Sequence, residues 1–395
     1  MTSHPTLARR EMAATSKQWM AGLAGLAWCA LAWAQSGGAG VEPPAVGPGK
    51  VTVRGALGGI ILGYDIDQAG GLGLLTEYVP RAGGRQDVAV ETFDPATGEI
   101  VSVVRQRRDT QSDYLAFGIF GHQVGLVEFE HVSDLFVDRR VYSTLSPLGG
   151  NAFTGRWTPP LHKADEIISA MAPSQGFDQT AALGFKNNGS DDSSYVFASN
   201  VGANTFGPLI KVTDPVFDWP HSPVIAIDQA HHQAVLGSSN GCFGCLAFIR
   251  VVDLETGDQF GLAAGGLGFV NGIAVDSGTS IACTTTEDDF KVQFHDLVKH
   301  TTIVAQLPGA TSQAQSGSAV AVDPVHKLFL VGQPISSTAP QGSSIHVFDE
   351  KGRLVESLNG FSLPASPAYM ALNPGERRGF VITAPGLDVL QSFRY

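Results

Sequence analysis

One pattern occurs four times in the C-terminal 175 residues of the chain. Each copy has a short apolar run that ends in Asp or Asn, a tight polar turn and a second apolar run, as in SAVAVDPVHKLFLVGQP from Ser318. The marker residues are Asp228, Asp276, Asp323 and Asn373, at intervals of 48, 47 and 50 residues. A period in the forties built from short β-type segments is typical of a β-propeller blade. The repeat therefore predicts an all-β propeller.

A second pattern places two apolar runs around a turn that Asp opens. It occurs at 251–260 (VVDLETGDQF) and at 347–358 (VFDEKGRLVESL), and at 88–104 (VAVETFDPATGEIVSVV) it extends into the N-terminal half. Asp favours the first position of such turns, and Gly accepts positive φ. We expect these runs to be the third and fourth strands of four-stranded blades.

The length of the chain favours seven blades. Without an N-terminal export signal of 34 residues, 361 residues remain, and a period near 47 leaves six and eight blades as the alternatives. The last copy has only three strand segments before the chain ends, and VTVRG at 51–55 is available as the missing outer strand. Pairing of this N-terminal strand with the last copy would close the ring and protect its edges.

The region from 146 to 201 fits the repeat less well. Residues 146–176 contain several prolines, and we expect an irregular insertion there, with one helical turn at 163–171. The segment GFDQTAALG at 176–184 aligns with GFVNGIAVD at 268–276. This alignment predicts the innermost strand of a decayed blade.

The first 34 residues have the organisation of an export signal. A basic segment with Arg9 and Arg10 precedes an apolar, uncharged run at 19–33, and Ala-Trp-Ala at 32–34 is a small-x-small cleavage site. That run is too short for a comfortable membrane span. We therefore expect an exported protein, periplasmic or extracellular, without a membrane span. Lipidation of Cys29 is the lesser alternative.

We expect a disordered leader rich in Gly and Pro at 35–49 and a single propeller domain at 50–395. The formal net charge is −12, and loss of residues 1–34 removes three bases and one acid, which leaves −14. An acidic surface disfavours polyanions, and nucleic-acid binding needs a basic face. We therefore expect a monomer whose partner is a small molecule or a protein and not a nucleic acid.

Three cysteines follow the signal: Cys242, Cys245 and Cys283. The Cys242-Phe-Gly-Cys245 motif lies in a predicted hairpin, without the βαβ context of a redox motif, the following His of a haem site or the second pair of a zinc site. We predict a small disulfide between Cys242 and Cys245 that pins this hairpin. Cys283 is expected to pack as a small apolar residue, with a bond to Cys242 or Cys245 as the alternative.

Ligands of propellers usually meet the loops at one end of the central channel, where the innermost strands begin and the second strands end. The binding candidates in these loops are Asp178, Asn271, Ser318 and Gln333. His221 is the acid–base candidate because His titrates near physiological pH. Its alternative interpretation is a packed or solvated loop histidine, since no carboxylate in the sequence pairs with it.

The blade pattern xxIAVD…LFV, followed by the hairpin D-x-x-(T/K)-G, resembles the repeat propellers of the YVTN, NHL and gluconolactonase-like type over residues 221–395. Asn271 in Val-Asn-Gly resembles the metal-binding Asn-Gly of the gluconolactonase-type proteins. With Asp178 and Glu287 as further oxygen ligands, the resemblance implies a site for Ca²⁺ or Mg²⁺. A cation there would polarise a lactone or ester carbonyl.

These observations support two functions of different classes. The first is an exported propeller of unassigned activity that binds a small molecule or a protein partner at the mouth of its channel. The second is a divalent-metal-dependent hydrolase or lyase, similar to a lactonase or esterase, with its site at the same mouth. The first is favoured because the sequence assembles no complete catalytic constellation.

Overall fold

The computed structural model describes most of the chain from residue 50 onwards, and residues 46–395 form one compact unit. The described residues are 50–67, 71–110, 113–120, 123–132, 137–146, 152–157, 166–172, 179–187, 192–200, 205–212, 224–239, 246–267, 270–286, 290–310, 317–334, 343–363, 370–383 and 386–395. The expected export signal and leader lie outside them. Among these residues, no helix is both long and apolar enough to cross a membrane.

The described residues form seven antiparallel sheets, which we number along the chain. Sheet 1 contains β2 (Ile60–Asp67), β3 (Leu72–Pro80), β4 (Gln86–Phe93) and β5 (Ile100–Thr110). Sheet 2 contains β6 (Asp113–Phe120), β7 (Gln123–Val132), β8 (Val137–Ser146) and β9 (Ala152–Trp157). Sheet 3 contains β10 (Glu166–Met171), β11 (Gln179–Asn187), β12 (Asp192–Asn200), β13 (Thr205–Phe206) and β14 (Ile210–Lys211).

The four copies of the repeat form the remaining sheets. Sheet 4 contains β15 (Ile225–Asp228), β16 (Gln233–Ser239), β17 (Leu246–Asp253) and β18 (Gln259–Leu267). Sheet 5 contains β19 (Val270–Asp276), β20 (Ile281–Thr286), β21 (Lys291–Asp296) and β22 (Thr301–Gln306). Sheet 6 contains β23 (Ala319–Asp323), β24 (Leu328–Gln333), β25 (Ser343–Asp349) and β26 (Leu354–Phe361). Sheet 7 contains β27 (Met370–Asn373), β28 (Arg378–Ile382), β29 (Val389–Arg394) and β1 (Thr52–Arg54).

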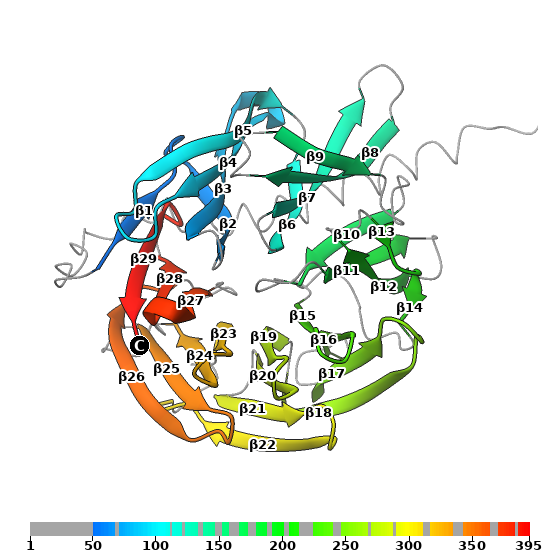
Figure 1. The fold of residues 1–395 in the computed structure, drawn as a ribbon, viewed down its shortest axis with the longest axis vertical. Helices are drawn as coiled ribbons and strands as arrows, with labels where there is room; N and C mark the ends of the chain where they lie inside the picture. The colour runs from blue at the N-terminus through cyan, green and yellow to red at the C-terminus, as the bar shows by residue number, and fades with distance from the viewer. Residues whose placement is uncertain are drawn as a thin grey trace, which may run out of the picture. The chain divides into compact units, whose positions relative to one another are not determined.

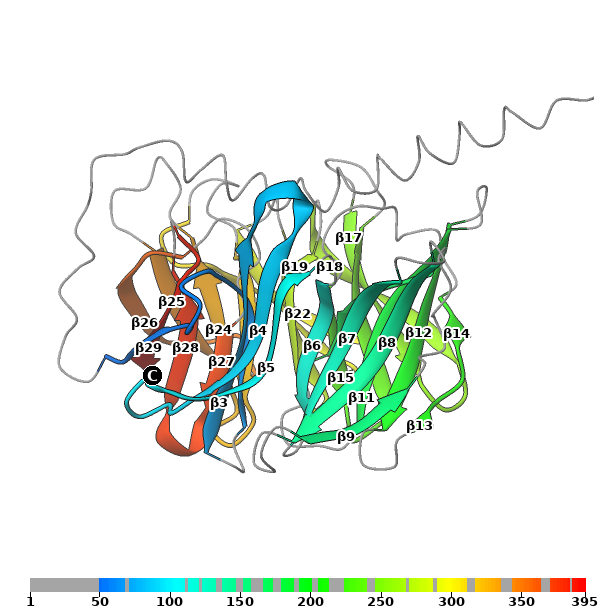
Figure 2. The ribbon, with the colours of Figure 1, turned by 90° about the horizontal axis from the view of Figure 1, so that it is seen from above.

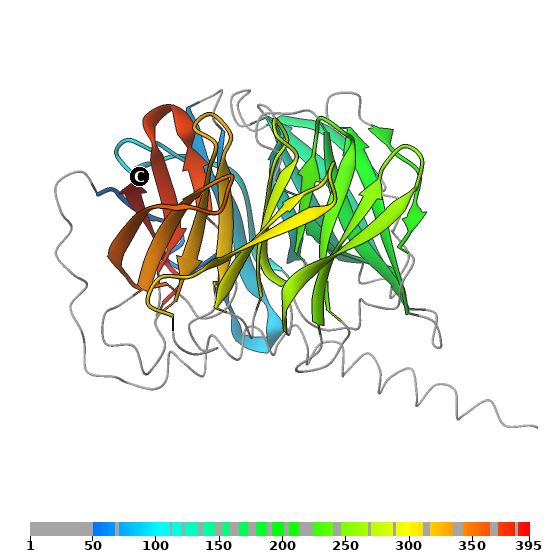
Figure 3. The same ribbon diagram turned by 90° about the horizontal axis from the view of Figure 1, so that it is seen from below.

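The sheets are arranged around a ring, with one strand of each on the inside (Figure 1). The innermost strands are β2, β6, β10, β15, β19, β23 and β27, and each contacts the next, including β27 with β2. Figures 2 and 3 show the same sheets from the side, with their strands crossing from one face of the ring to the other. This arrangement confirms the predicted all-β propeller. Two 3₁₀ turns, η1 (Ala82–Gly84) and η4 (Pro374–Glu376), join strands.

The N-terminal strand closes the ring. Strand β1 pairs with β29 in antiparallel register, with Val53 opposite Leu390, and the two strands lie side by side in Figure 1. Val51 extends this pairing, because its N–H donates to Ser392 Oγ at 2.7 Å and its carbonyl accepts from Ser392 N at 2.8 Å. The Val53 side chain is fully buried in the core that sheets 6, 7 and 1 share. The predicted closure is therefore confirmed.

The marker residues shape the turns between the first and second strands. Asp276 Oδ1 accepts from Gly278 N at 2.9 Å, and Asp323 Oδ1 accepts from Val325 N at 3.0 Å, as an Asx turn requires. Four residues after each marker, the backbone has a left-handed φ between 49° and 56°, at His232, Ser280, Lys327 and Arg377. The recurrence of this uncommon conformation shows that the four copies share one turn geometry.

Two expectations for the region from 146 to 201 were wrong. Residues 146–176 contain the strands β9 and β10, the outer strand of sheet 2 and the innermost strand of sheet 3, instead of an irregular insertion with a helical turn. The segment GFDQTAALG does not supply the innermost strand, because residues 179–187 form β11, the second strand. Its counterpart in the repeat is QAVLGSS of β16, one strand later than predicted.

Cys283 lies on β20 in the middle of a buried cluster, and it is a free thiol. The cluster also holds Phe294, Phe329 and Phe348, with the rings of Phe294 and Phe329 edge to face at 5.6 Å. Burial raises the pKa of the Cys283 thiol well above its ordinary value. The expectation of a packed, apolar role for Cys283 agrees with this position. The predicted Cys242–Cys245 disulfide lies outside the described residues.

The closure of the ring can be tested at Val53. Replacing Val53 with Ala removes two buried methyl groups at the β1–β29 seam, so we expect the free energy of unfolding to fall by about 1–3 kcal/mol. Val101→Ala on the outer strand β5 is the matched control, because that side chain is 58% exposed and its loss should cost less than about 0.5 kcal/mol. Equal losses in urea unfolding would contradict a structural role for the seam.

Candidate functional site

Each sheet has two ends, which we name by its innermost strand. At the starting end the innermost strand begins. At the marker end the innermost strand stops, and in sheets 4 to 7 this is where the marker residue lies. Bonds between neighbouring sheets join like ends. Asn271, next to the start of β19, donates from Nδ2 to the carbonyl of Gly317 before β23 at 3.2 Å. At the marker ends, Gln229 N donates to Ser277 Oγ at 2.9 Å.

Three of the predicted binding residues lie at the starting ends of sheets 5 and 6. Asn271 is half-buried on β19, Ser318 is 1% exposed just before β23, and Gln333 is 8% exposed at the end of β24. Ser318 N donates to the carbonyl of Gly332 at 2.8 Å, and Asn271 contacts Gly317, so the three positions belong to one neighbourhood. The predicted site residues that the structure describes therefore come together.

Sheet 5 and the start of sheet 6 contain polar atoms that are buried and have no hydrogen-bond partner. They are Ser318 Oγ, Thr285 Oγ1, Thr286 Oγ1 and Gln293 Nε2. Gly317 lies directly against Thr285, because a Cβ placed on Gly317 would be 2.5 Å from Cγ2 of Thr285. Strand alternation puts Thr286 and Gln293 on the opposite face of sheet 5, toward sheet 4. We call these four side chains, which lie on both faces of sheet 5 and at the start of sheet 6, the unpaired cluster.

Each buried polar atom without a partner costs about 1–3 kcal/mol, so such atoms in native proteins call for a bound water or a ligand. The unpaired cluster carries hydroxyl and amide groups but no charge. It therefore suits neutral groups that both donate and accept hydrogen bonds. Ser318 was a sequence candidate, whereas Thr285 and Gln293 were missed; the signal was the run Thr284-Thr285-Thr286 inside a strand buried on both faces.

The remaining predicted site residues cannot be placed. His221, Asp178 and Glu287 lie outside the described residues. Gln179, which follows Asp178 in the sequence, begins β11, and this puts Gln179 at the marker end of sheet 3 and not at the starting end. The described part of the chain has no group of three or more His, Cys, Asp or Glu side chains that could hold a metal ion. The Ca²⁺ or Mg²⁺ site stays a prediction.

Two buried histidines occupy the third strands of sheets 5 and 6. His295 Nε2 lies 2.9 Å from Thr284 Oγ1, and its Nδ1 lies 2.9 Å from Thr302 Oγ1. In sheet 6, His346 bridges its sheet in the same way. Its Nε2 lies 2.8 Å from Gln333 Oε1, and its Nδ1 lies 2.9 Å from Ser357 Oγ. Each imidazole thus links the second strand to the fourth strand.

Burial lowers the pKa of both histidines to about 4. Neither His295 nor His346 is therefore charged near neutral pH, and each holds its neighbours as a neutral donor and acceptor. This environment favours a structural role over acid–base chemistry at neutral pH. The contact between His346 Nε2 and Gln333 Oε1 holds the side chain of Gln333, which is a predicted binding residue.

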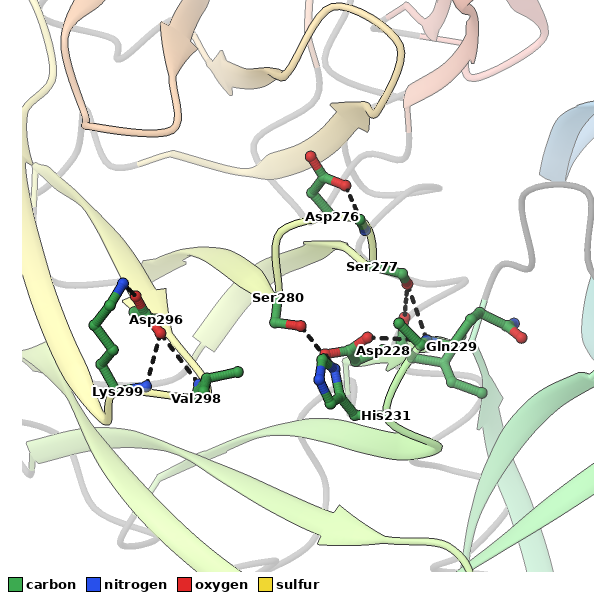
Figure 4. Close-up of polar contacts among 12 residues, drawn as sticks. Asp228, Gln229, His231, Asp276, Ser277, Ser280, Asp296, Val298 and Lys299 are labelled. Atoms are coloured by element: carbon green, nitrogen blue, oxygen red, sulfur yellow. Dashed lines mark hydrogen bonds and ion pairs between the residues drawn. The ribbon is translucent and has the colours of Figure 1, made fainter.

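The marker ends have a different chemistry, which Figure 4 shows for sheets 4 and 5. His231 Nδ1 lies 3.0 Å from Asp228 Oδ2 and 2.8 Å from Ser280 Oγ of the next sheet. In sheet 6, His326 Nδ1 lies 2.7 Å from Asp323 Oδ2. Both histidines lie in the turns after the marker residues, at the end opposite to the candidate site.

Sheet 5 lacks this arrangement. Thr279 stands where sheets 4 and 6 have His231 and His326, and both Thr279 Oγ1 and Asp276 Oδ2 are buried without a partner. In Figure 4 the carboxylate of Asp276 points away from His231. The histidine at this position is thus a means of satisfying the buried marker carboxylate, and sheet 5 shows what its replacement leaves behind.

The buried histidines predict a loss of stability in acid. An unfolded histidine binds a proton near pH 6.5, whereas His295 and His346 bind one only near pH 4, so the unfolded chain holds more protons between these values. Each histidine should remove about 2 kcal/mol of unfolding free energy as the pH falls from 7 to 4.5. His346→Gln keeps hydrogen-bonding groups. In urea titrations at the two pH values, this variant should lack the acid-induced loss of unfolding free energy that belongs to His346. His232→Gln, at an exposed turn, should leave the pH dependence unchanged, and an equal effect of both variants would contradict the assignment.

The C-terminal Tyr395 gives a second test, at the marker end. Tyr395 Oη donates to Asp323 Oδ2 at 2.9 Å across the boundary of sheets 6 and 7, and both residues are buried. Because the bond is made to a buried carboxylate, Tyr395→Phe should lower the free energy of unfolding by about 1–3 kcal/mol. In an Asp323→Asn background the same substitution should cost clearly less. Additive effects in this double-mutant cycle would contradict a direct link.

Comparison with known proteins places the fold but no family. No protein-family model and no curated protein sequence matches the chain. The solved structure of U3-55K is similar with a TM-score of 0.60 and 11% identity, covering 90% of this chain and 100% of that one. The WD40 repeats of RRP9 are similar with a TM-score of 0.60 and 11% identity, covering 88% of this chain and 97% of that one.

Hydrazine synthase of Kuenenia stuttgartiensis is similar with a TM-score of 0.55 and 11% identity, over 87% of this chain and 97% of that one. At such identities the likeness concerns the fold alone. It supports the β-propeller architecture, and it transfers no activity to this chain.

Proposed function

We propose that the protein is an exported β-propeller that binds a small neutral polar molecule, or a polar segment of a protein partner, at the starting ends of sheets 5 and 6. The unpaired cluster is the observation that carries this proposal. Ser318 at the start of sheet 6, Thr285 on the face of sheet 5 toward sheet 6, and Thr286 and Gln293 on the face toward sheet 4 all carry uncompensated hydroxyl or amide groups. Half-buried Asn271 stands beside them and can reach a ligand from solvent.

Two further observations support the choice of this end. The starting ends of a propeller surround the mouth of its channel, where loops of several sheets converge. At the marker ends of sheets 4 and 6, Asp228 and Asp323 accept internal bonds from histidines, and Asp323 also accepts from Tyr395. The marker turn of sheet 5 differs, because Asp276 Oδ2 and Thr279 Oγ1 are buried there without a partner. The four-copy repeat further supports a propeller of the YVTN, NHL or gluconolactonase-like type.

Thermal unfolding of the mature chain with millimolar neutral sugars tests the site. We expect at least one monosaccharide or disaccharide to raise the Tm of the wild type, because sugar hydroxyls both donate and accept. Asn271→Ala and Ser318→Ala should lose this shift. Thr301→Val, on the exposed outer strand β22, should keep it. The same shift in all variants, or no shift with any sugar, would contradict the proposed ligand class and site.

Two measurements on the same preparation address the rest of the proposal. N-terminal sequencing of the protein from the exported fraction should begin at Gln35, and a mature chain that keeps residues 1–34 would contradict export by a cleaved signal.

Elemental analysis, together with thermal melts in EDTA, distinguishes the binding protein from the metal-dependent hydrolase. A stoichiometric divalent ion and a Tm that falls in chelator would favour that enzyme instead.

A further inference from the structure

Two glutamates form a buried pair in sheet 1, far along the chain from the candidate site. Glu77 on β3 is 1% exposed and Glu91 on β4 is fully buried. In the register of the two strands, Glu77 lies opposite Ala89 and Glu91 lies opposite Leu75. The two carboxyl groups are therefore diagonal neighbours on one face of the sheet.

The pair holds the segment 55–59, which links the closing strand β1 to the innermost strand β2. Ala56 N donates to Glu91 Oε2 at 2.9 Å, and Leu57 N donates to Glu77 Oε2 at 2.8 Å. Gly59 N donates to Glu77 Oε1. Three backbone donors of one short segment thus end on two carboxyl groups, and we call this segment the hinge loop.

The hinge loop rests directly on the carboxyl group of Glu77. A Cβ placed on Gly55 would lie 2.3 Å from Cδ of Glu77, so only glycine fits at this distance. Gly58 has a φ of 68°, the left-handed conformation that glycine accepts without strain, and its N–H closes a turn onto the carbonyl of Gly55 at 3.3 Å. The loop is therefore shaped to cover the pair.

One of the four carboxyl oxygens of the pair can carry a proton. Three of the four carboxyl oxygens accept from the hinge loop, while Glu91 Oε1 is buried and has no partner. Two buried carboxylates side by side repel each other strongly unless one of them is protonated. A proton on Glu91 relieves the repulsion and supplies a donor between the two groups.

We propose that a proton on Glu91, next to Glu77, makes the pair a pH-sensitive latch, which holds the hinge loop and, through it, the closing strand β1. Below neutral pH this proton keeps the latch closed. Above neutral pH Glu91 loses the proton and gains a charge beside Glu77, and the hinge loop loosens at the point where the ring closes. The latch lies in sheet 1, so it does not depend on the proposed ligand site.

The pair lies on the face of sheet 1 that also carries Leu75 and Phe93, two residues of the core shared with sheets 6 and 7. On the neighbouring strands, Arg54 pairs with Asp388 at 2.7 Å, and Asp87 pairs with Arg81. Asp65 on β2 accepts from Ile66 N at 2.8 Å. On the facing sheet 7, Arg378 Nη1 donates to the carbonyl of Pro95 at 2.6 Å, and Arg378 Nε lies 3.5 Å from Glu376. Arg108 on β5 is exposed.

The electrostatics of Glu91 agree with the geometry. Burial raises the pKa of Glu91 to about 7, the bond from Ala56 N opposes this rise, and the neighbouring carboxyl group of Glu77 adds to it. Because the pKa in the folded protein is above the ordinary value of 4.5, the proton stabilises the folded state fully below pH 4.5. That stability is lost as the pH rises through about 7.

Limited trypsin digestion tests the latch, because Arg54 directly precedes the hinge loop and its side chain is 65% exposed. Cleavage after Lys299, whose side chain is 76% exposed on a turn of sheet 5, is the internal reference that cancels the pH dependence of trypsin. In the wild type we expect the ratio of cleavage after Arg54 to cleavage after Lys299 to rise about tenfold from pH 6 to pH 8.5. Glu91→Gln mimics the protonated acid and should keep the ratio constant.

Glu99→Gln, in the exposed turn between β4 and β5, is the matched control and should keep the wild-type response. A constant ratio in the wild type, or a rise that Glu91→Gln leaves unchanged, would overturn the latch.

Infrared spectroscopy covers the case in which Glu91→Gln fails to fold. The wild type should then show the carbonyl band of a protonated carboxylic acid that disappears with a midpoint near pH 7, and absence of that band at pH 6 would overturn the proposal.

Discussion

The whole structure depends on each sheet finding a neighbour on both sides. A single four-stranded sheet cannot bury both of its faces, so it is stable only between two others, and a row of such sheets must close on itself. Closure rests on three residues of β1 that pair with β29, which brings the first described strand beside the last. Val53 at this seam is as deeply buried as the centre of any sheet. A short N-terminal strand thus determines the integrity of the ring.

The two ends of the ring use polar groups in opposite ways. At the marker ends of sheets 4 and 6, buried Asp228 and Asp323 are satisfied by their own turns and by histidines. At the starting ends of sheets 5 and 6, the unpaired cluster leaves hydroxyl and amide groups without partners. The marker end of sheet 5 is an exception, because Asp276 Oδ2 and Thr279 Oγ1 are buried there without a partner. The proposed binding of polar molecules rests on the uncompensated groups at the starting ends.

The sequence predicted the repeated turns, the hairpins and the closing strand because each has a local signal, namely a marker Asp, a turn residue or a lone strand. It failed at Glu166–Met171, because a short apolar run in an innermost strand has no period-2 alternation and is indistinguishable from a helical turn. The Glu77–Glu91 pair was also missed. Nothing local in the sequence marks the two residues as buried, and the hinge loop that bonds them is distant from Glu91 in sequence.

A crystal structure of the mature protein, at a resolution that places water, tests the central claim that the starting ends of sheets 5 and 6 form a polar binding site. The account predicts ordered water or ligand density within hydrogen-bond distance of at least two members of the unpaired cluster, next to Asn271. Ser318, Thr285 and Thr286 bonded to one another or to the backbone, with no density beside them, would contradict it.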